Sequence, residues 1–325
     1  MTRFNGSILG SPRGSNSTSA SGVWSVNNVG IARLSDAWPI VGSSISGYTS
    51  GGGTPAVLNT IDKFPFASDS NASDVGDLSQ GRYGTVGQSS SVNGYSSGGG
   101  LPVVNTIDKF PFSANANASD VGNLSQTRYQ SAGQSSLSSG YTSGGNSPAV
   151  PGPSNTIDKF PFSSDTDATD VGDLTVPRRL TTGQSSSESG YSSGGLSPTV
   201  VVNTIDKFPF ASDANASDVG DLTVSRHTPA GQSSTVSGYT SGGDSVGNTI
   251  DKFPFASNAN ATDVGDLTVA RRVGAGQSSS ASGYTSGGIP GPLNTIDKFP
   301  FASNANASDV GDLTISRFLA AGQQG

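Results

Sequence analysis

The sequence predicts an all-β protein, a six-bladed β-propeller whose blades are four-stranded sheets. Three observations lead to this prediction. The octet NTIDKFPF occurs six times, small and large side chains fall in different parts of the repeated unit, and the chain ends on a segment that the first unit lacks. These observations bear on the number of blades, their wedge shape and the closure of the ring.

The spacing of the octet defines the repeated unit. The octet begins at Asn59, Asn105, Asn155, Asn203, Asn248 and Asn294, so the units are 45 to 50 residues long. Repeats of this length are typical of four-stranded blades or of helix pairs. Helices are excluded, because Gly, Ser, Thr, Val and Pro recur throughout and no stretch has apolar residues at i, i+3, i+4 and i+7.

Four strand candidates follow one another in each unit, separated by turn residues. We label them a to d from the propeller axis outward: a contains GQSS, b is GYTSGG or GYSSGG, c is NTIDKFPF, and d centres on DVGDL. Pro65 and its equivalents fall near the end of c, where a missing backbone donor is tolerated. All variation in length falls between b and c.

Side-chain size supports this order. Candidate a is dominated by Gly, Ala, Ser and Thr, which suits the convergence of blades at an axis. The large apolar residues lie in c and d, where blades diverge: Ile61, Phe64, Phe66, Val75 and Leu78. A stacked fibre or β-solenoid is the alternative architecture, but it would not need small residues confined to one strand.

The two ends of the repeat complement each other. The first unit starts at b, with Gly47 and Tyr48, and the chain ends on an unpaired a, Phe318 to Gly325. If this C-terminal strand joins the first blade, the ring closes and exposed sheet edges are removed. We expect an N-terminal arm and docking segment over residues 1–42 and the propeller over residues 43–325.

Composition excludes several functional classes. A net charge of -7 with 13% charged residues has the wrong sign for binding nucleic acid. The absence of Cys excludes disulfides, thiol nucleophiles and thiolate metal sites. No apolar run reaches the roughly 18 residues that span a bilayer, and the N-terminus lacks the apolar stretch of a secretory signal. We expect a protein made without a cleaved leader and without membrane insertion.

The repeated unit resembles the kelch repeat. The resemblance rests on a small-residue strand, a Tyr followed by a Gly-Gly pair, an N-x-I-D-x-F strand, and a further strand that leads into Leu and then Arg. It covers residues 43–325 and implies a kelch-like propeller. Kelch units usually carry a Trp in d, where this chain has DVGDL and Val75 is the nearest candidate.

A second resemblance lies upstream of the repeats. Residues Ser21 to Pro39, SGVWSVNNVGIARLSDAWP, look like a short GVW…WP segment near the start of structural proteins of tailed phages, marine ones in particular. The repeats also look like those of phage-encoded proteins. Together the resemblances imply a non-catalytic virion structural or tail-appendage protein, made in the host cytoplasm. It would act through contacts with other virion proteins or with further copies of itself; the alternative is a carbohydrate-binding module for host attachment.

The same upstream segment contains both Trp residues of the chain. Ser25 is a candidate N-cap of a short helix that would present an apolar surface made of Trp24, Ile31, Leu34 and Trp38. This surface would either pack on the propeller or dock to another virion protein. Residues 1–20 are expected to form an extended arm that becomes ordered on assembly.

The turn between c and d spaces side-chain oxygens as a calcium loop does. The densest copy holds Asp165, Asp167, Asp170 and Asp173. No copy has the central Gly and distal Glu of an EF-hand loop, and Asx side chains that cap the turn backbone account for the pattern. We therefore predict no metal ion, with these four carboxylates as a weak calcium candidate.

Catalysis is not predicted. Sixfold copies of Asp62, Lys63 and Arg82 are more consistent with ion pairs that join blades than with acid–base chemistry. The one His of the chain, His227, has no Ser/His/Asp partners in the sequence, and neither HExxH nor a phosphate-binding loop occurs. We expect neither enzyme activity nor a cofactor.

One variable position predicts a binding face. The residue after the repeated Arg changes from unit to unit, and it lies in the d-to-a connection, which emerges on the same side of a blade as the variable b-to-c connection. Large aromatic and cationic groups are common binding anchors. The predicted partner-binding residues are Tyr83, Tyr129, Arg179, His227, Arg272 and Phe318. Neutral drift in solvated loops is the alternative explanation.

Overall fold

The computed structural model describes residues 12–15, 20–22, 45–148, 152–244 and 247–325. The chain divides into two units, Met1–Ser43 and Ser44–Gly325. In the first unit, strand β1 (Pro12–Ser15) pairs in antiparallel fashion with β2 (Ala20–Gly22). Among the described residues, no helix is long and apolar enough to cross a membrane.

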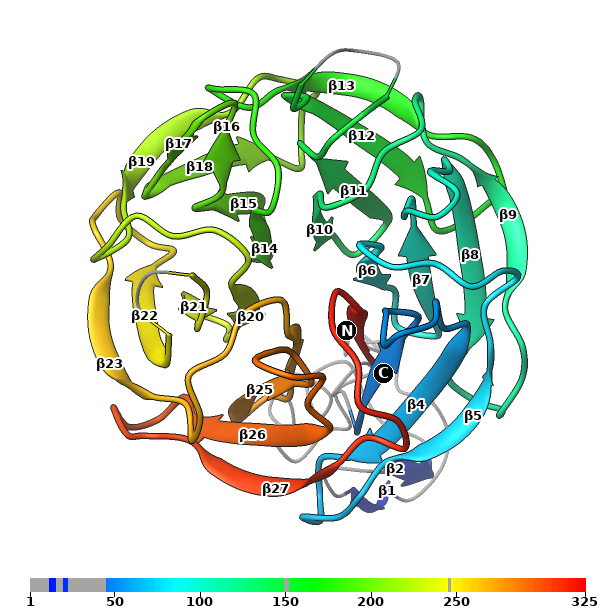
Figure 1. Cartoon of the computed structure of the whole chain (residues 1–325). Coiled ribbons are helices and arrows are strands. Elements are labelled where there is room, and N and C mark those ends of the chain that lie inside the picture. Colours follow the sequence, from blue (N-terminus) through cyan, green and yellow to red (C-terminus); the bar gives the residue numbers. More distant parts are fainter. Residues whose placement is uncertain (1–11, 16–19, 23–44, 149–151, 245–246) are drawn as a thin grey trace, which may run out of the picture. The chain divides into compact units, whose positions relative to one another are not determined.

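The second unit is a six-bladed β-propeller of four-stranded antiparallel blades, so the predicted fold is confirmed (Figure 1). From the axis outward, blade 1 is β28 (Ala321–Gln324), β3 (Ser46–Ser50), β4 (Thr60–Pro65) and β5 (Ser73–Asp77). Blade 2 is β6 (Val86–Ser89), β7 (Asn93–Ser97), β8 (Thr106–Pro111) and β9 (Ser119–Asn123). Blade 3 is β10 (Ala132–Ser135), β11 (Ser139–Ser143), β12 (Thr156–Pro161) and β13 (Thr169–Asp173).

The remaining three blades repeat the same order. Blade 4 is β14 (Thr182–Ser185), β15 (Ser189–Ser193), β18 (Thr204–Pro209) and β19 (Ser217–Asp221), with a short extra hairpin of β16 (Leu196–Ser197) and β17 (Val200–Val201). Blade 5 is β20 (Ala230–Ser233), β21 (Ser237–Ser241), β22 (Thr249–Pro254) and β23 (Thr262–Asp266). Blade 6 is β24 (Ala275–Ser278), β25 (Ser282–Ser286), β26 (Thr295–Pro300) and β27 (Ser308–Asp312).

The C-terminal strand closes the ring as predicted. β28 pairs with β3 in a register that places Ala321 opposite Ser50 and Gln324 opposite Gly47. The carbonyl of Gly325 also accepts hydrogen bonds from the backbone N–H groups of Ile45 and Ser46, at 2.8 and 2.9 Å. Blade 1 therefore joins the two ends of the repeat through main-chain hydrogen bonds.

The octet supplies the apolar packing between blades. Tyr48, Ile61 and Leu78 of blade 1 form one buried cluster with Phe110 of blade 2, and Phe112 packs against it. The ring of Phe112 stacks on Tyr48 with centroids 4.9 Å apart. Equivalent clusters lie at the other five blade contacts. The two Phe residues of the octet thus fill the space between blades, in a protein whose strand d carries no Trp.

The innermost strands come together so closely that a side chain is excluded. A Cβ atom added to Gly133 in β10 would lie 2.3 Å from the carbonyl oxygen of Gly87 in β6. Real Cβ contacts are essentially never shorter than 3.0 Å. The prediction that strand a needs small residues is confirmed, because the blades approach each other there backbone to backbone.

A buried ion pair also joins each blade to the next. Arg128 Nη2 lies 2.6 Å from Asp158 Oδ2 in blade 3, and both side chains have no exposed surface. The backbone N–H of Arg128 donates to Val104 O in blade 2, so this residue connects two blades. Asp158 also accepts hydrogen bonds from the backbone N–H and hydroxyl of Ser125. The six pairs are Arg317–Asp62, Arg82–Asp108, Arg128–Asp158, Arg178–Asp206, Arg226–Asp251 and Arg271–Asp297.

We predict that Asp158→Asn lowers the free energy of unfolding by about 3 kcal/mol, because it leaves the Arg128 guanidinium as an uncompensated buried charge. Asp213→Asn is the matched control: Asp213 pairs with Lys159 but its side chain is 61% exposed, and an exposed pair is worth less than about 1 kcal/mol. Urea unfolding measures the free energy of unfolding of both variants. If the two variants lost the same amount of stability, burial would not explain the effect of Asp158→Asn.

Candidate binding face

Two sets of connections lie on one face of the propeller. Tyr83 precedes β6 and Gly100 follows β7; the Gly100 N–H donates to Tyr83 O at 2.7 Å, and the Tyr83 N–H donates to Gly100 O at 3.4 Å. Equivalent bridges join Tyr129 to Asn146 and Arg179 to Leu196. We call this side the variable face. It holds the connections that enter each innermost strand and the loops of variable length, as the sequence predicted.

A closed ring of backbone hydrogen bonds surrounds the axis on this face. The Gln130 N–H donates to Gly84 O, the Leu180 N–H donates to Gln130 O, and the circle closes where the Gly84 N–H donates to Leu319 O, over distances of 2.7 to 2.8 Å. We call its members the inner ring: Gly84, Gln130, Leu180, Thr228, Val273 and Leu319. All six have a left-handed backbone, with φ between 53° and 65°.

The left-handed backbone of the inner ring is strained at five positions, because only one member is Gly. This conformation costs an ordinary residue about 1 to 2 kcal/mol, and the β-branched Thr228 and Val273 are the least suited to it. Such strain persists where the surrounding structure holds it, here through the hydrogen bonds to both neighbours. Sequence reasoning missed this ring, since none of the five carries the Gly or Asn that signals positive φ.

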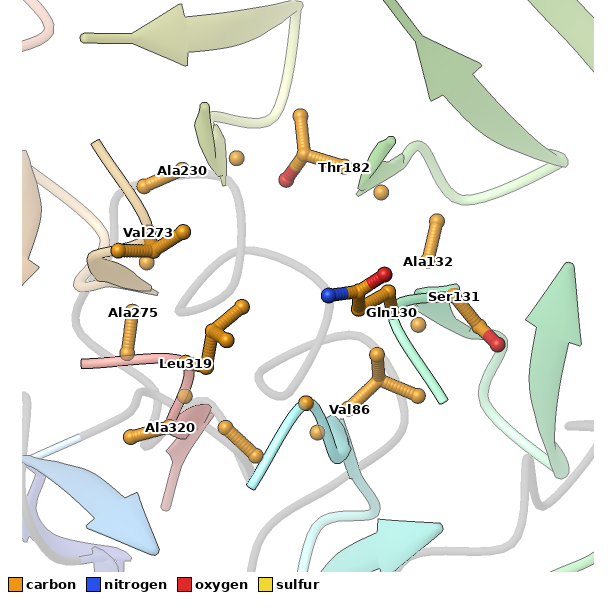
Figure 2. A pocket seen from close by; sticks show the side chains of 18 of the residues that line it. Val86, Gln130, Ser131, Ala132, Thr182, Ala230, Val273, Ala275, Leu319 and Ala320 are labelled. Atoms are coloured by element: carbon orange, nitrogen blue, oxygen red, sulfur yellow. The ribbon is translucent and has the colours of Figure 1, made fainter. Parts of the chain in front are cut away.

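The inner ring surrounds a cavity of about 120 Å³ on the propeller axis. Residues of the innermost strands, such as Val86, Thr182 and Ala275, line it further in. Figure 2 shows the side chains of Gln130 and Leu319 extending into the opening. None of the lining residues is titratable. The cavity therefore offers van der Waals contacts, hydroxyl groups and one side-chain amide, and no charge.

The six predicted binding residues form a second circle, one residue before the inner ring. We call it the outer ring: Phe318, Tyr83, Tyr129, Arg179, His227 and Arg272, which lead into blades 1 to 6 in that order. Its composition is divided. Three consecutive positions are aromatic, and the next three carry a guanidinium or an imidazole. The variable face thus has an aromatic half and a cationic half.

In the aromatic half, neighbouring side chains contact each other. The rings of Tyr83 and Tyr129 meet edge to face with centroids 6.4 Å apart. The Asn146 side-chain amide donates a hydrogen bond of 2.9 Å to the Tyr129 hydroxyl. Phe318 is fixed through its backbone, which exchanges hydrogen bonds with Gly53 at 2.8 and 2.9 Å. All three rings are partly exposed, so they present apolar surface at the rim.

In the cationic half, one carboxylate serves two of the three side chains. Asp244 Oδ2 lies 3.1 Å from His227 Nε2, and Asp244 Oδ1 accepts a hydrogen bond from Arg272 Nη1. Burial lowers the pKa of His227; Asp244 opposes this shift, and the charges of Arg272 and Arg179 add to it. His227 is therefore neutral at pH 7. Arg179 has no ion-pair partner among the residues that the structure describes.

Three of the four calcium candidates, Asp165, Asp167 and Asp170, bind different partners. Asp165 Oδ1 accepts a hydrogen bond from Lys109 Nζ, Asp167 Oδ1 from the Asn123 N–H, and Asp170 Oδ1 from the Gly172 N–H two residues on. The described part of the chain contains no group of three His, Cys, Asp or Glu side chains placed to hold a metal. Asp170 lies within β13 and makes an Asx-type bond to the backbone two residues on, whereas Asp167 of the turn itself binds the backbone of the neighbouring blade.

The second predicted docking surface, Trp24, Ile31, Leu34 and Trp38, lies outside the described residues. No protein-family model matches the sequence, and no curated protein matches it either. The variable face is therefore the candidate site that the geometry supports.

We predict that the wild-type protein loses thermal stability relative to His227→Gln as the pH falls from about 7.5 to about 5.5. The folded protein holds the pKa of His227 below its ordinary 6.5, so the unfolded chain binds the proton more readily and acid favours unfolding. Asp244→Asn should enlarge the loss, because it removes the group that raises this pKa. Parallel Tm profiles for wild type and His227→Gln would show that the imidazole has no lowered pKa.

Proposed function

We propose that the protein is a non-catalytic binding protein that makes its partner contacts through the variable face. One observation carries the proposal: six different connections, held by a uniform set of ion pairs and backbone hydrogen bonds, place aromatic and cationic residues on consecutive blades, each next to a member of the inner ring. Such residues are enriched among the energetically dominant contacts of interfaces. The untitratable lining of the axial cavity supports a role without catalysis.

The resemblances suggest where this contact is made. The likeness of the repeats to kelch units supports a kelch-like protein, and the GVW…WP segment supports a virion structural or tail-appendage protein of a tailed phage. We propose that it is made in the host cytoplasm and is incorporated into the virion through other virion proteins or further copies of itself. We propose neither a nucleic-acid partner nor insertion into a membrane.

Host attachment through carbohydrate is the second candidate function. The division of the outer ring favours it, because aromatic faces pack on sugar rings while cations pair with acidic groups. In this case the variable face contacts the host surface, and the virion contacts lie elsewhere on the protein.

We expect a combined Tyr83→Ala, Tyr129→Ala and Arg179→Ala variant to reduce virion assembly or host adsorption at least tenfold, since truncating anchor side chains typically costs more than about 1 kcal/mol each. The matched control replaces Val92, Leu137 and Val236 by Ser. These side chains are 60%, 96% and 66% exposed on the connections of the opposite face. Undiminished assembly and adsorption of the first variant, or a loss only in the second, would exclude the variable face as the contact surface.

A further inference from the structure

We propose that the mouth of the axial cavity binds an acidic saccharide, with Arg179 pairing with its carboxylate or sulfate group and the aromatic half of the outer ring packing on its sugar faces. The inference rests on the proposed function, in that the variable face is taken as the contact face. It adds the chemical class of the ligand and the residue that selects it.

Charge pairing across the propeller singles out Arg179. Six arginines are buried against aspartates, and Arg272 pairs with Asp244. Three lysines pair with aspartates of a neighbouring blade, and three lie over tyrosine rings at 5.5 to 5.8 Å. Within residues 45–325 as described, only the guanidinium of Arg179 has neither an ion-pair partner nor a ring. A planar, always charged group with free donors is suited to bidentate binding of a carboxylate or sulfate.

The surroundings of Arg179 increase its preference for an anion. Its charge acts on His227, and so does that of Arg272. Among the described residues, Asp244 is the only carboxylate that pairs with this half, and its two oxygens contact His227 and Arg272, not Arg179. One net positive charge is therefore left over at the rim. A single acidic group on the ligand would neutralise it.

The aromatic half supplies the second part of the recognition. Phe318, Tyr83 and Tyr129 lie on consecutive blades and are only partly exposed, so their rings are held in place before a ligand arrives. A sugar ring presents one apolar C–H face, which packs on an aromatic ring, and hydroxyl groups at its edge. The Tyr129 hydroxyl accepts a hydrogen bond from Asn146 and retains its own proton to donate.

The inner ring argues for a compact ligand over an extended peptide. Its six N–H groups donate to its own six carbonyl groups, so the ring leaves no main-chain edge at the mouth for a peptide strand to pair with. What remains is side chains: those of Gln130 and Leu319 extend into the opening, and Leu180 also lines it. Recognition here depends on a ligand that brings its own hydrogen-bonding groups close together, as a saccharide does.

The test is an array of neutral, carboxylated and sulfated oligosaccharides probed with the full chain, followed by titration of the best binder. We expect acidic members to bind and neutral members of the same backbone to bind at least tenfold more weakly. The carboxylated and sulfated arms identify which anion is used. Affinity should fall as the salt concentration rises, because the pair is partly exposed. Equal binding of acidic and neutral saccharides would overturn the proposal.

Variants assign the binding to residues. Arg179→Gln should weaken binding of the acidic saccharide about tenfold or more, the loss of a charged hydrogen-bonded pair, while Arg179→Lys should retain part of it. Lys207→Gln, which removes a cation from β18 of the same blade, is the control and should bind as the wild type does. Unchanged affinity in Arg179→Gln would refute the role of Arg179. The thermal midpoint of each variant shows whether it is folded, and Tyr83→Ala tests the aromatic half independently.

The outcomes separate this inference from the function on which it rests. If no saccharide binds but the triple variant of the variable face still impairs assembly or adsorption, the face is the contact surface and the saccharide is wrong. If the protein binds an acidic peptide and no saccharide, the proposed saccharide ligand is likewise wrong, but the variable face is still the contact surface. If an acidic saccharide binds and only substitutions on the opposite face abolish the binding, both proposals fail.

Discussion

The buried arginine–aspartate pair between successive blades is the interaction on which the rest of the structure depends. Apolar packing brings blades together but is non-directional, whereas two charges without water require a fixed geometry and further hydrogen bonds. Burial lowers the pKa of Arg128 and Asp158 opposes this shift. Asp158 also binds Ser125, which belongs to the preceding blade. Six such contacts join every blade to the next around the ring.

The variable face depends on this uniform scaffold. Because backbone atoms alone form the inner ring, its side chains are free to differ: Gly84, Gln130 and Val273 occupy equivalent positions. The side chains of the outer ring can also differ from blade to blade, because the main chain of each connection positions its member. Structural requirements are therefore met by the repeated residues, and chemical variety is confined to positions that those requirements leave open.

Most of the fold could be predicted from the sequence, and the site only in part. The octet count, the small residues of strand a and the strand after Phe318 each reflect a constraint that acts on residue type, so they are visible in the sequence. The left-handed inner ring is not, because tertiary hydrogen bonds impose it on residues such as Leu180 that do not favour it. The packing of Phe112 between blades was predicted, because its equivalent Phe66 is one of the large apolar residues expected where blades diverge, but its stacking on Tyr48 depends on tertiary structure and was not.

The position of Phe318 has a consequence for the timing of folding. Phe318 exchanges backbone hydrogen bonds with Gly53, near the start of the repeats, and becomes the neighbour of Tyr83 only in the closed ring. During synthesis on the ribosome, five blades can form while the aromatic half is still incomplete. The aromatic half of the variable face is therefore the last part of that face to be completed as the chain folds.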